Sequence, residues 1–103
     1  MIAVLFAPAF LYAGQIYGRI VSDGKGLKAA KIEVQCGQAT AVTGTTAADG
    51  AYRINVPQQG QCTLGLPEQA GHPTASIFSS PNPALYDFEL VKASDGKMEL
   101  KRK

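Results

Sequence analysis

Hydrophobic and polar residues alternate along most of the chain from Gly14 onward, which is the two-residue period of a β-strand. No segment keeps a helical period for more than about one turn. Turn residues such as Gly50 and Gly96 separate the alternating segments. The pattern therefore predicts an all-β chain with strands in GQIYGRIVS (14–22), KIEVQC (31–36), ATAVTGTT (39–46), AYRINV (51–56), QCTLGL (61–66), TASIFSS (74–80), YDFEL (86–90) and a final strand around Leu100.

Each of these strands has one apolar face, and each must bury that face against another layer. Two packed antiparallel sheets achieve this with few exposed edges, so we predict an antiparallel β-sandwich. A small barrel is the alternative. With 103 residues the chain is too short for two independent cores, and we expect residues 14–103 to form one domain.

The last hairpin allows a more detailed prediction. If Leu90 and Leu100 share a face and pair directly, equal numbers of residues lie inward from each, and the loop has an odd length. This favours the three-residue loop Ser94-Asp95-Gly96 over a two-residue turn. The last residue of such loops adopts the left-handed conformation, so we predict a positive φ at Gly96.

The first thirteen residues are apolar, and the first charge is that of Arg19. They are too few for a membrane-spanning helix, which needs about 20 residues, so we expect no stable membrane span. Their length fits the apolar region of a signal peptide cut after Ala13, although no Lys or Arg precedes it and Leu11 is large for its position. The alternative is a first strand, which Pro8 disfavours. We expect a signal peptide at 1–13 and a secreted or periplasmic protein.

Both cysteines lie in phase with core residues. Cys36 shares a face with Val34, and Cys62 shares one with Leu64. Two buried cysteines of an exported protein are expected to be bonded, and we predict a disulfide that ties the two sheets together. The alternatives are two inert core thiols of a cytosolic protein or, less favoured by their spacing, metal ligands.

Residues 15–66 show a family resemblance. The segment GRIVSDGKGLKAAKIEV followed by TTAADGAYRINVPQQGQCTLGL resembles the carboxypeptidase regulatory-like domain, also described as transthyretin- or prealbumin-like. Two places depart from that pattern: Leu27 and Lys28 replace a turn proline, and Ala47 replaces a turn aspartate for which Asp49 can substitute. The matching turn and core positions are Gly18, Gly26, Ala30, Ile32, Val34, Gly50, Tyr52, Val56, Pro57, Gly60 and Leu64.

The resemblance implies a seven- to eight-stranded antiparallel Greek-key β-sandwich of the prealbumin-like type, found in small secreted bacterial proteins. In metallocarboxypeptidases the related unit follows the catalytic domain and performs no chemistry. The resemblance therefore implies an accessory module, and no catalytic residue carries over to this chain.

The residues with catalytic potential form no recognisable set. His72 is the only histidine, whereas a zinc hydrolase needs two histidines and a carboxylate. No serine stands in a Gly-x-Ser-x-Gly motif. Asp23, Asp49 and Asp95 neighbour glycines and are best explained as turn caps, with a calcium site as the alternative. We expect no enzyme and no cofactor or metal.

The charge of the chain argues against nucleic-acid binding. The net charge is only +2, and the one basic cluster joins Lys97 to the terminal 101–103. A nucleic-acid binder would have a strong basic excess on one face. We expect no nucleic-acid partner.

Two functions then compete. We predict a structural or interaction module that contacts an unknown protein partner at the cell envelope through edge strands or loops. The alternative is a carbohydrate-binding sandwich, because Tyr17 lies out of phase with the core and can offer an aromatic ring to a polysaccharide. The other ring-bearing residues of the strands, Tyr52, Tyr86 and Phe88, are in phase with core positions, and we expect them to be buried.

Overall fold

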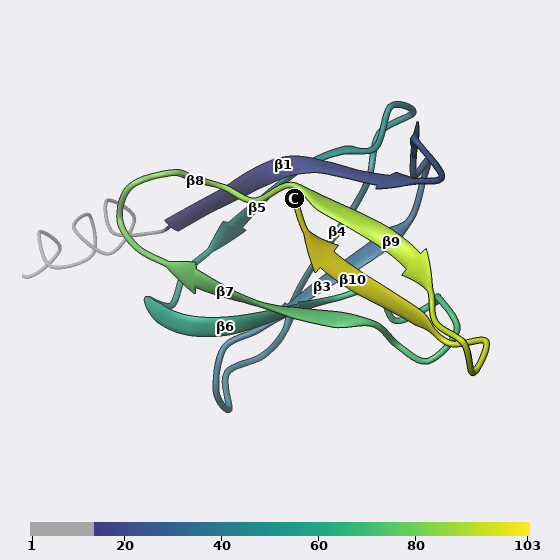
Figure 1. Cartoon of the computed structure of the whole chain (residues 1–103). Helices are drawn as coiled ribbons and strands as arrows, with labels where there is room; N and C mark the ends of the chain where they lie inside the picture. Colours follow the sequence, from purple (N-terminus) through teal and green to yellow (C-terminus); the bar gives the residue numbers. More distant parts are fainter. Residues whose placement is uncertain (1–13) are drawn as a thin grey trace, which may run out of the picture.

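A computed structural model describes residues 14–103, which form ten β-strands and no helix, so the all-β prediction is confirmed (Figure 1). The predicted signal peptide, residues 1–13, lies outside the described residues. The strands are β1 (Gly14–Ser22), β2 (Lys25–Gly26), β3 (Lys31–Gln35), β4 (Val42–Thr45), β5 (Ala51–Val56), β6 (Gly60–Gly65), β7 (Thr74–Ser79), β8 (Ala84–Leu85), β9 (Phe88–Lys92) and β10 (Met98–Arg102).

The strands form two sheets with one hydrophobic core. The six-stranded sheet has the order β10-β9-β1-β2, with β5 and β8 also paired to β1, and the four-stranded sheet has the order β4-β3-β6-β7. Both sheets contribute to the core, which includes Ile16 and Phe88 from the first and Ile32 and Leu64 from the second. This arrangement of two layers is consistent with a β-sandwich.

The six-stranded sheet is mixed, so the prediction of purely antiparallel sheets is wrong. Strand β1 pairs with β5 in antiparallel fashion and with β8 and β9 in parallel fashion. Alternation fixes which face a side chain takes but leaves the direction of the neighbouring strand open, because both ladders have the same two-residue period. The four-stranded sheet is antiparallel throughout.

The strand predicted at 86–90 begins only at Phe88. Tyr86 and Asp87 belong to no strand and interrupt the pairing with β1 between β8 and β9. At this point the backbone N–H of Arg19 donates to Oδ1 of Asp87 at 2.8 Å, so a side chain replaces a backbone carbonyl. Gly18 permits this approach, since a Cβ there would lie 2.7 Å from the carbonyl carbon of Tyr86. The register is the same on both sides of the interruption, with Tyr17 opposite Leu85 and Ile20 opposite Phe88.

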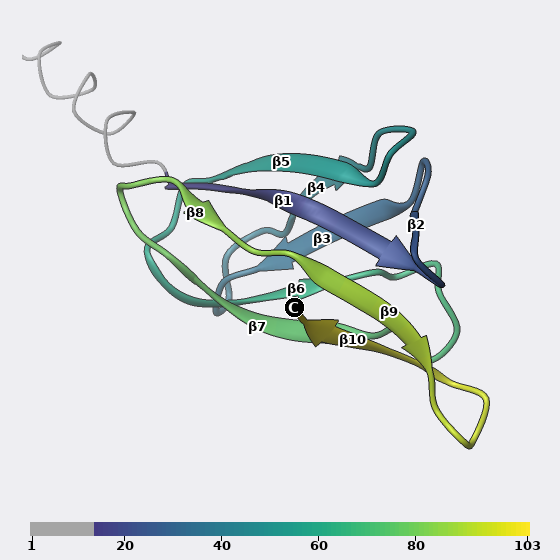
Figure 2. The same ribbon diagram turned by 45° about the horizontal axis from the view of Figure 1, so that its top comes forward.

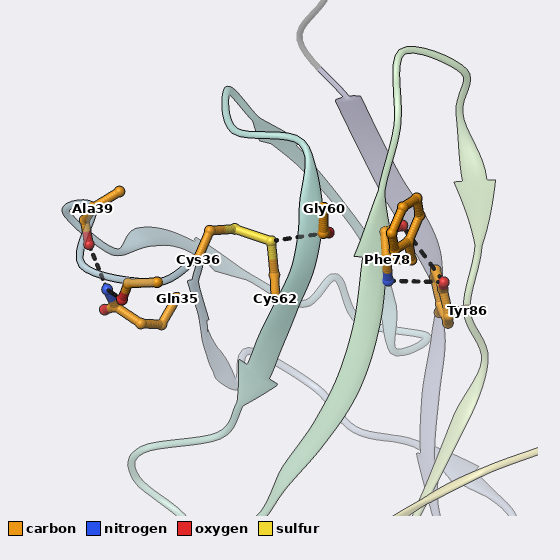
Figure 3. The surroundings of a disulfide bond; sticks show 8 residues. Gln35, Cys36, Ala39, Gly60, Cys62, Phe78 and Tyr86 are labelled. Atoms are coloured by element: carbon orange, nitrogen blue, oxygen red, sulfur yellow. Dashed lines mark hydrogen bonds between the residues drawn. A yellow bond between two sulfur atoms is a disulfide. The ribbon is translucent and has the colours of Figure 1, made fainter.

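The disulfide expected from the sequence is present, but it lies within one sheet. Cys36 directly follows β3 and Cys62 lies in β6, and these two strands are neighbours (Figure 3). The register pairs Gln35 with Thr63, which places the cysteines opposite each other with Cα atoms 4.3 Å apart. The prediction that sulfur ties the two sheets together is therefore wrong, because the phase of a residue shows its face and not its sheet.

The β9–β10 hairpin has the predicted register. Leu90 is opposite Leu100, and the backbone N–H of Ala93 donates to the carbonyl of Lys97 at 2.8 Å, which leaves residues 94–96 as the loop. Gly96 has a φ of 87°, in the left-handed region. The side chain of Asp95 accepts a hydrogen bond from the backbone of Lys97 at 3.0 Å and caps this turn.

The turn before β5 is capped in the same way. Oδ1 of Asp49 accepts the N–H of Ala51 at 3.0 Å, so Asp49 caps the turn in the way expected for it. Gly50 follows at a φ of 86° and donates its N–H to the carbonyl of Ala47. Its carbonyl accepts the N–H of Ile20 at 3.0 Å, which attaches the turn to β1.

Candidate functional site

Tyr17 lies at the centre of a row of side chains that crosses three strands. Its Cα partners are Arg53 on β5 and Leu85 on β8. Figure 2 shows these strands side by side, with β1 between β5 and the β8–β9 segment. Because neighbouring residues in register share a face, and Tyr17 is out of phase with buried Ile16, the row lies on the outer face of the sheet.

A second row lies next to it, built around Arg19. Arg19 is the Cα partner of Ala51, and its backbone is bonded to Asp87 on the other side. The guanidinium Nε of Arg19 donates to the carbonyl of Asp49 at 3.0 Å. Arg53, in the first row, makes no side-chain hydrogen bond or ion pair within the part of the chain that the structure describes. Among the described residues, the side chain of Arg19 is thus hydrogen-bonded and that of Arg53 is not.

These rows line an open hollow of about 550 Å³, which we call the Tyr17 hollow. A volume of this size lies within the range of small-ligand sites. Leu85 is 53% exposed there although it is a large apolar residue. The lining residues are Tyr17, Gly18, Arg19, Thr45, Ala47, Ala51, Tyr52, Arg53, Leu85 and Asp87.

Tyr52 supports the hollow from below. It is opposite Gly18 in the register and only 5% exposed, and its hydroxyl donates to the carbonyl of Tyr86 at 2.6 Å. Burial raises the pKa of the Tyr52 hydroxyl well above its usual value, and the charge of Asp87 raises it further, against a smaller opposing effect of Arg102. The phenol therefore stays neutral and acts as a fixed hydrogen-bond donor across the β8–β9 interruption.

Replacing Tyr52 with phenylalanine is expected to lower the free energy of unfolding by about 1 kcal/mol at pH 7, because the carbonyl of Tyr86 loses a buried donor. The raised pKa adds a pH dependence. Below pH 10 the phenol is neutral in both states, and above pH 10 it ionises first in the unfolded chain, so the stability of the unmutated protein falls as pH rises toward the folded pKa.

Denaturant unfolding at pH 7 and at pH 10.5–11.5 measures both effects of this substitution. The stability difference between the unmutated protein and Tyr52→Phe should shrink as the pH rises, because only the unmutated protein has this phenol. A difference that stays constant across that range would contradict the burial of a neutral Tyr52 hydroxyl.

A smaller hollow of about 230 Å³ is lined by Tyr86 and Arg102 together with residues of β6 and β7. The hydroxyl of Tyr86 accepts the backbone N–H of Phe78 at 2.9 Å, as Figure 3 shows, and the guanidinium of Arg102 lies 4.4 Å from the centre of the Tyr86 ring. Phe78 itself is 57% exposed, whereas its neighbour Ile77 is buried. The Tyr86 side chain thus fills part of the unpaired edge of β7.

The remaining candidates from the sequence were His72 and a metal site. His72 is exposed in the loop between β6 and β7. Within residues 14–103, no three His, Cys, Asp or Glu side chains come together in a way that could hold a metal ion. The same residues contain no helix that is long and apolar enough to cross a membrane.

The sequence identified Tyr17 as a candidate contact residue but missed its neighbours. Arg53 alternates out of phase with the core of β5, and Leu85 precedes the strand that was predicted from Tyr86, so neither carried a signal of its own. The chain matches no known protein-family model and no curated protein sequence.

Proposed function

We propose that this chain is a non-catalytic module of an exported protein and contacts a partner protein at the cell envelope through the Tyr17 hollow. The observation that carries the proposal is the row in which exposed Leu85 and Arg53, whose side chain has no bonding partner among residues 14–103, flank Tyr17. Tyrosine and arginine are enriched at the energetic centres of protein interfaces, where they combine apolar area with directed hydrogen bonds.

The fold and the location form part of the same proposal. The alternation and turn residues of 15–66 support a prealbumin-like Greek-key sandwich, and the two-sheet core is compatible with it. The Cys36–Cys62 disulfide supports a secreted or periplasmic location, because such bonds persist in oxidising compartments. A rigid, cross-linked scaffold of this kind can present one face to a partner without chemistry of its own.

Site-specific photo-crosslinking in the native host tests the proposed contact. A photoreactive amino acid replaces Leu85 in the hollow, and in a control variant it replaces Thr63, which is exposed on the four-stranded sheet. Position 85 is expected to give a defined protein adduct and position 63 is not. The adduct should be lost when Tyr17→Ala is added. Equal adducts from both positions, or none from position 85, would contradict the proposal.

Carbohydrate binding is the second candidate, and the placement of Tyr17 is the observation that favours it. A partly exposed ring beside Arg19, Arg53 and Asp87 can stack on a pyranose while the charged groups bond its hydroxyls. Saturable binding to a polysaccharide that is lost in Tyr17→Ala, together with the absence of a protein adduct at position 85, would replace the first candidate with the second.

A further inference from the structure

We propose that the ligand of the Tyr17 hollow is an acidic, extended peptide segment of the partner protein. One carboxylate of the segment binds between Arg19 and Arg53, and an apolar side chain two residues away packs against Tyr17 and Leu85. This inference rests on the proposed function and specifies the chemistry that the same site recognises.

The charges of the lining favour an anion. Arg19 and Arg53 carry two positive charges and Asp87 one negative charge, which leaves the lining at +1. Asp87 already accepts the backbone N–H of Arg19, so it is held in the sheet. Arg53 has no partner within residues 14–103 and stands directly opposite Tyr17. A planar guanidinium with free donors matches a carboxylate in two parallel hydrogen bonds.

The two arginines are placed to share one acidic group. Arg53 is opposite Tyr17 across the β1–β5 ladder, and Arg19 is two residues further along β1 on the same face. Residues in this diagonal relation have Cα atoms about 7–8 Å apart, and both side chains line the Tyr17 hollow. The Nε of Arg19 is bonded to the carbonyl of Asp49, which leaves its terminal nitrogens available to a ligand.

Leu85, at the apolar end of the row, requires that the peptide also carry an apolar side chain. From Arg53 through Tyr17 to Leu85 the row changes from cationic to apolar over two strand spacings, about 10 Å. In an extended peptide, side chains at i and i+2 share a face and lie about 7 Å apart. An acidic residue, any residue and then an apolar residue therefore fit the row. The exposed aliphatic Leu85 favours such a peptide over a sugar, whose rim is polar.

Selection from a displayed library of random heptapeptides tests this inference directly. The bait is the oxidised protein, either unmutated or carrying Arg53→Gln, and the matched control is Lys31→Gln, which removes one exposed charge from the other sheet. We expect peptides with an acidic residue two positions from an apolar one to be enriched by the unmutated protein and by Lys31→Gln. Arg53→Gln should lose this enrichment.

The best-enriched peptide then provides an affinity measurement. Changing its acidic residue to the corresponding amide, or introducing Arg53→Gln, should each weaken binding about tenfold, because a charge-assisted hydrogen bond is lost. The two changes together should cost little more than either alone. Binding should also weaken as salt rises, since the site is open to solvent.

Three outcomes would overturn the inference. The first is enrichment without acidic residues or no enrichment at all, and the second is equal enrichment by Arg53→Gln. The third is that the selection yields no peptide while the protein binds polygalacturonate, an acidic polysaccharide, in a way that depends on Tyr17. Crosslinking at position 85 separates this failure from that of the proposed function. A protein adduct without acidic enrichment leaves the module function standing, whereas the absence of an adduct removes it.

Discussion

Replacing Cys36 or Cys62 with serine is expected to lower the free energy of unfolding by about 3–4 kcal/mol under oxidising conditions. The disulfide closes a loop between residues 26 positions apart, and cutting it gives the unfolded chain back the entropy that the closed loop removes. Small domains are stabilised by only about 5–15 kcal/mol in total, so the loss should be plain in a denaturant titration.

The three cysteine variants and a reductant provide the controls. Both single variants and the double variant should have nearly the same stability, because each removes the same covalent bond and the effects are not additive. Reducing the unmutated protein should lower its stability to about that of the double variant, and the reductant should leave the double variant unchanged. A single variant as stable as the unmutated protein under oxidising conditions would show that the bond does not support the fold.

The second large effect is expected at Gly50. Replacing Gly50 with alanine should destabilise the protein by about 2–5 kcal/mol, because two penalties combine. The residue has a φ of 86°, and a Cβ there would collide with the carbonyl oxygen of Ile20 and lie 2.8 Å from the backbone nitrogen of Leu27. The turn before β5 would have to move away from β1.

Gly96 provides a matched comparison for Gly50. Its φ of 87° is nearly the same, but a Cβ at Gly96 would meet no atom within 4 Å. Gly96→Ala should therefore cost only the left-handed backbone penalty, about 1–2 kcal/mol. Thermal or denaturant unfolding of the two variants measures the difference. Equal losses would show that the packing of the Gly50 turn against β1 contributes little.

The sequence predicted the local features of the fold well. Alternation placed Tyr52 inside, and Tyr52 is buried on β5 together with Ile54 and Val56. In the last hairpin, Leu90 pairs with Leu100, as was assumed when the three-residue loop 94–96 was predicted. These features depend on neighbours in the sequence, where the two-residue period and the turn chemistry act directly.

The features that the sequence did not reveal depend on contacts between distant strands. Asp87 was predicted to lie within the strand 86–90, but it precedes β9 and its side chain bonds the backbone of Arg19, 68 residues away. The same limit applies to the Tyr17 hollow, because Arg53 and Leu85 approach Tyr17 only through the pairing of β5 and β8 with β1. Periodicity cannot select among the possible neighbours of a strand.

The hydroxyl of Tyr86 accepts the backbone N–H of Phe78, and this hydrogen bond affects how the edge of β7 can associate with another chain. A backbone group at the margin of β7 is already occupied, so another chain cannot add itself there as an extra strand without displacing a buried ring. Self-association of this protein through backbone pairing along the edge of β7 is therefore disfavoured. At this edge, recognition by side chains is favoured over backbone pairing, and side chains, unlike the backbone, discriminate between one sequence and the next.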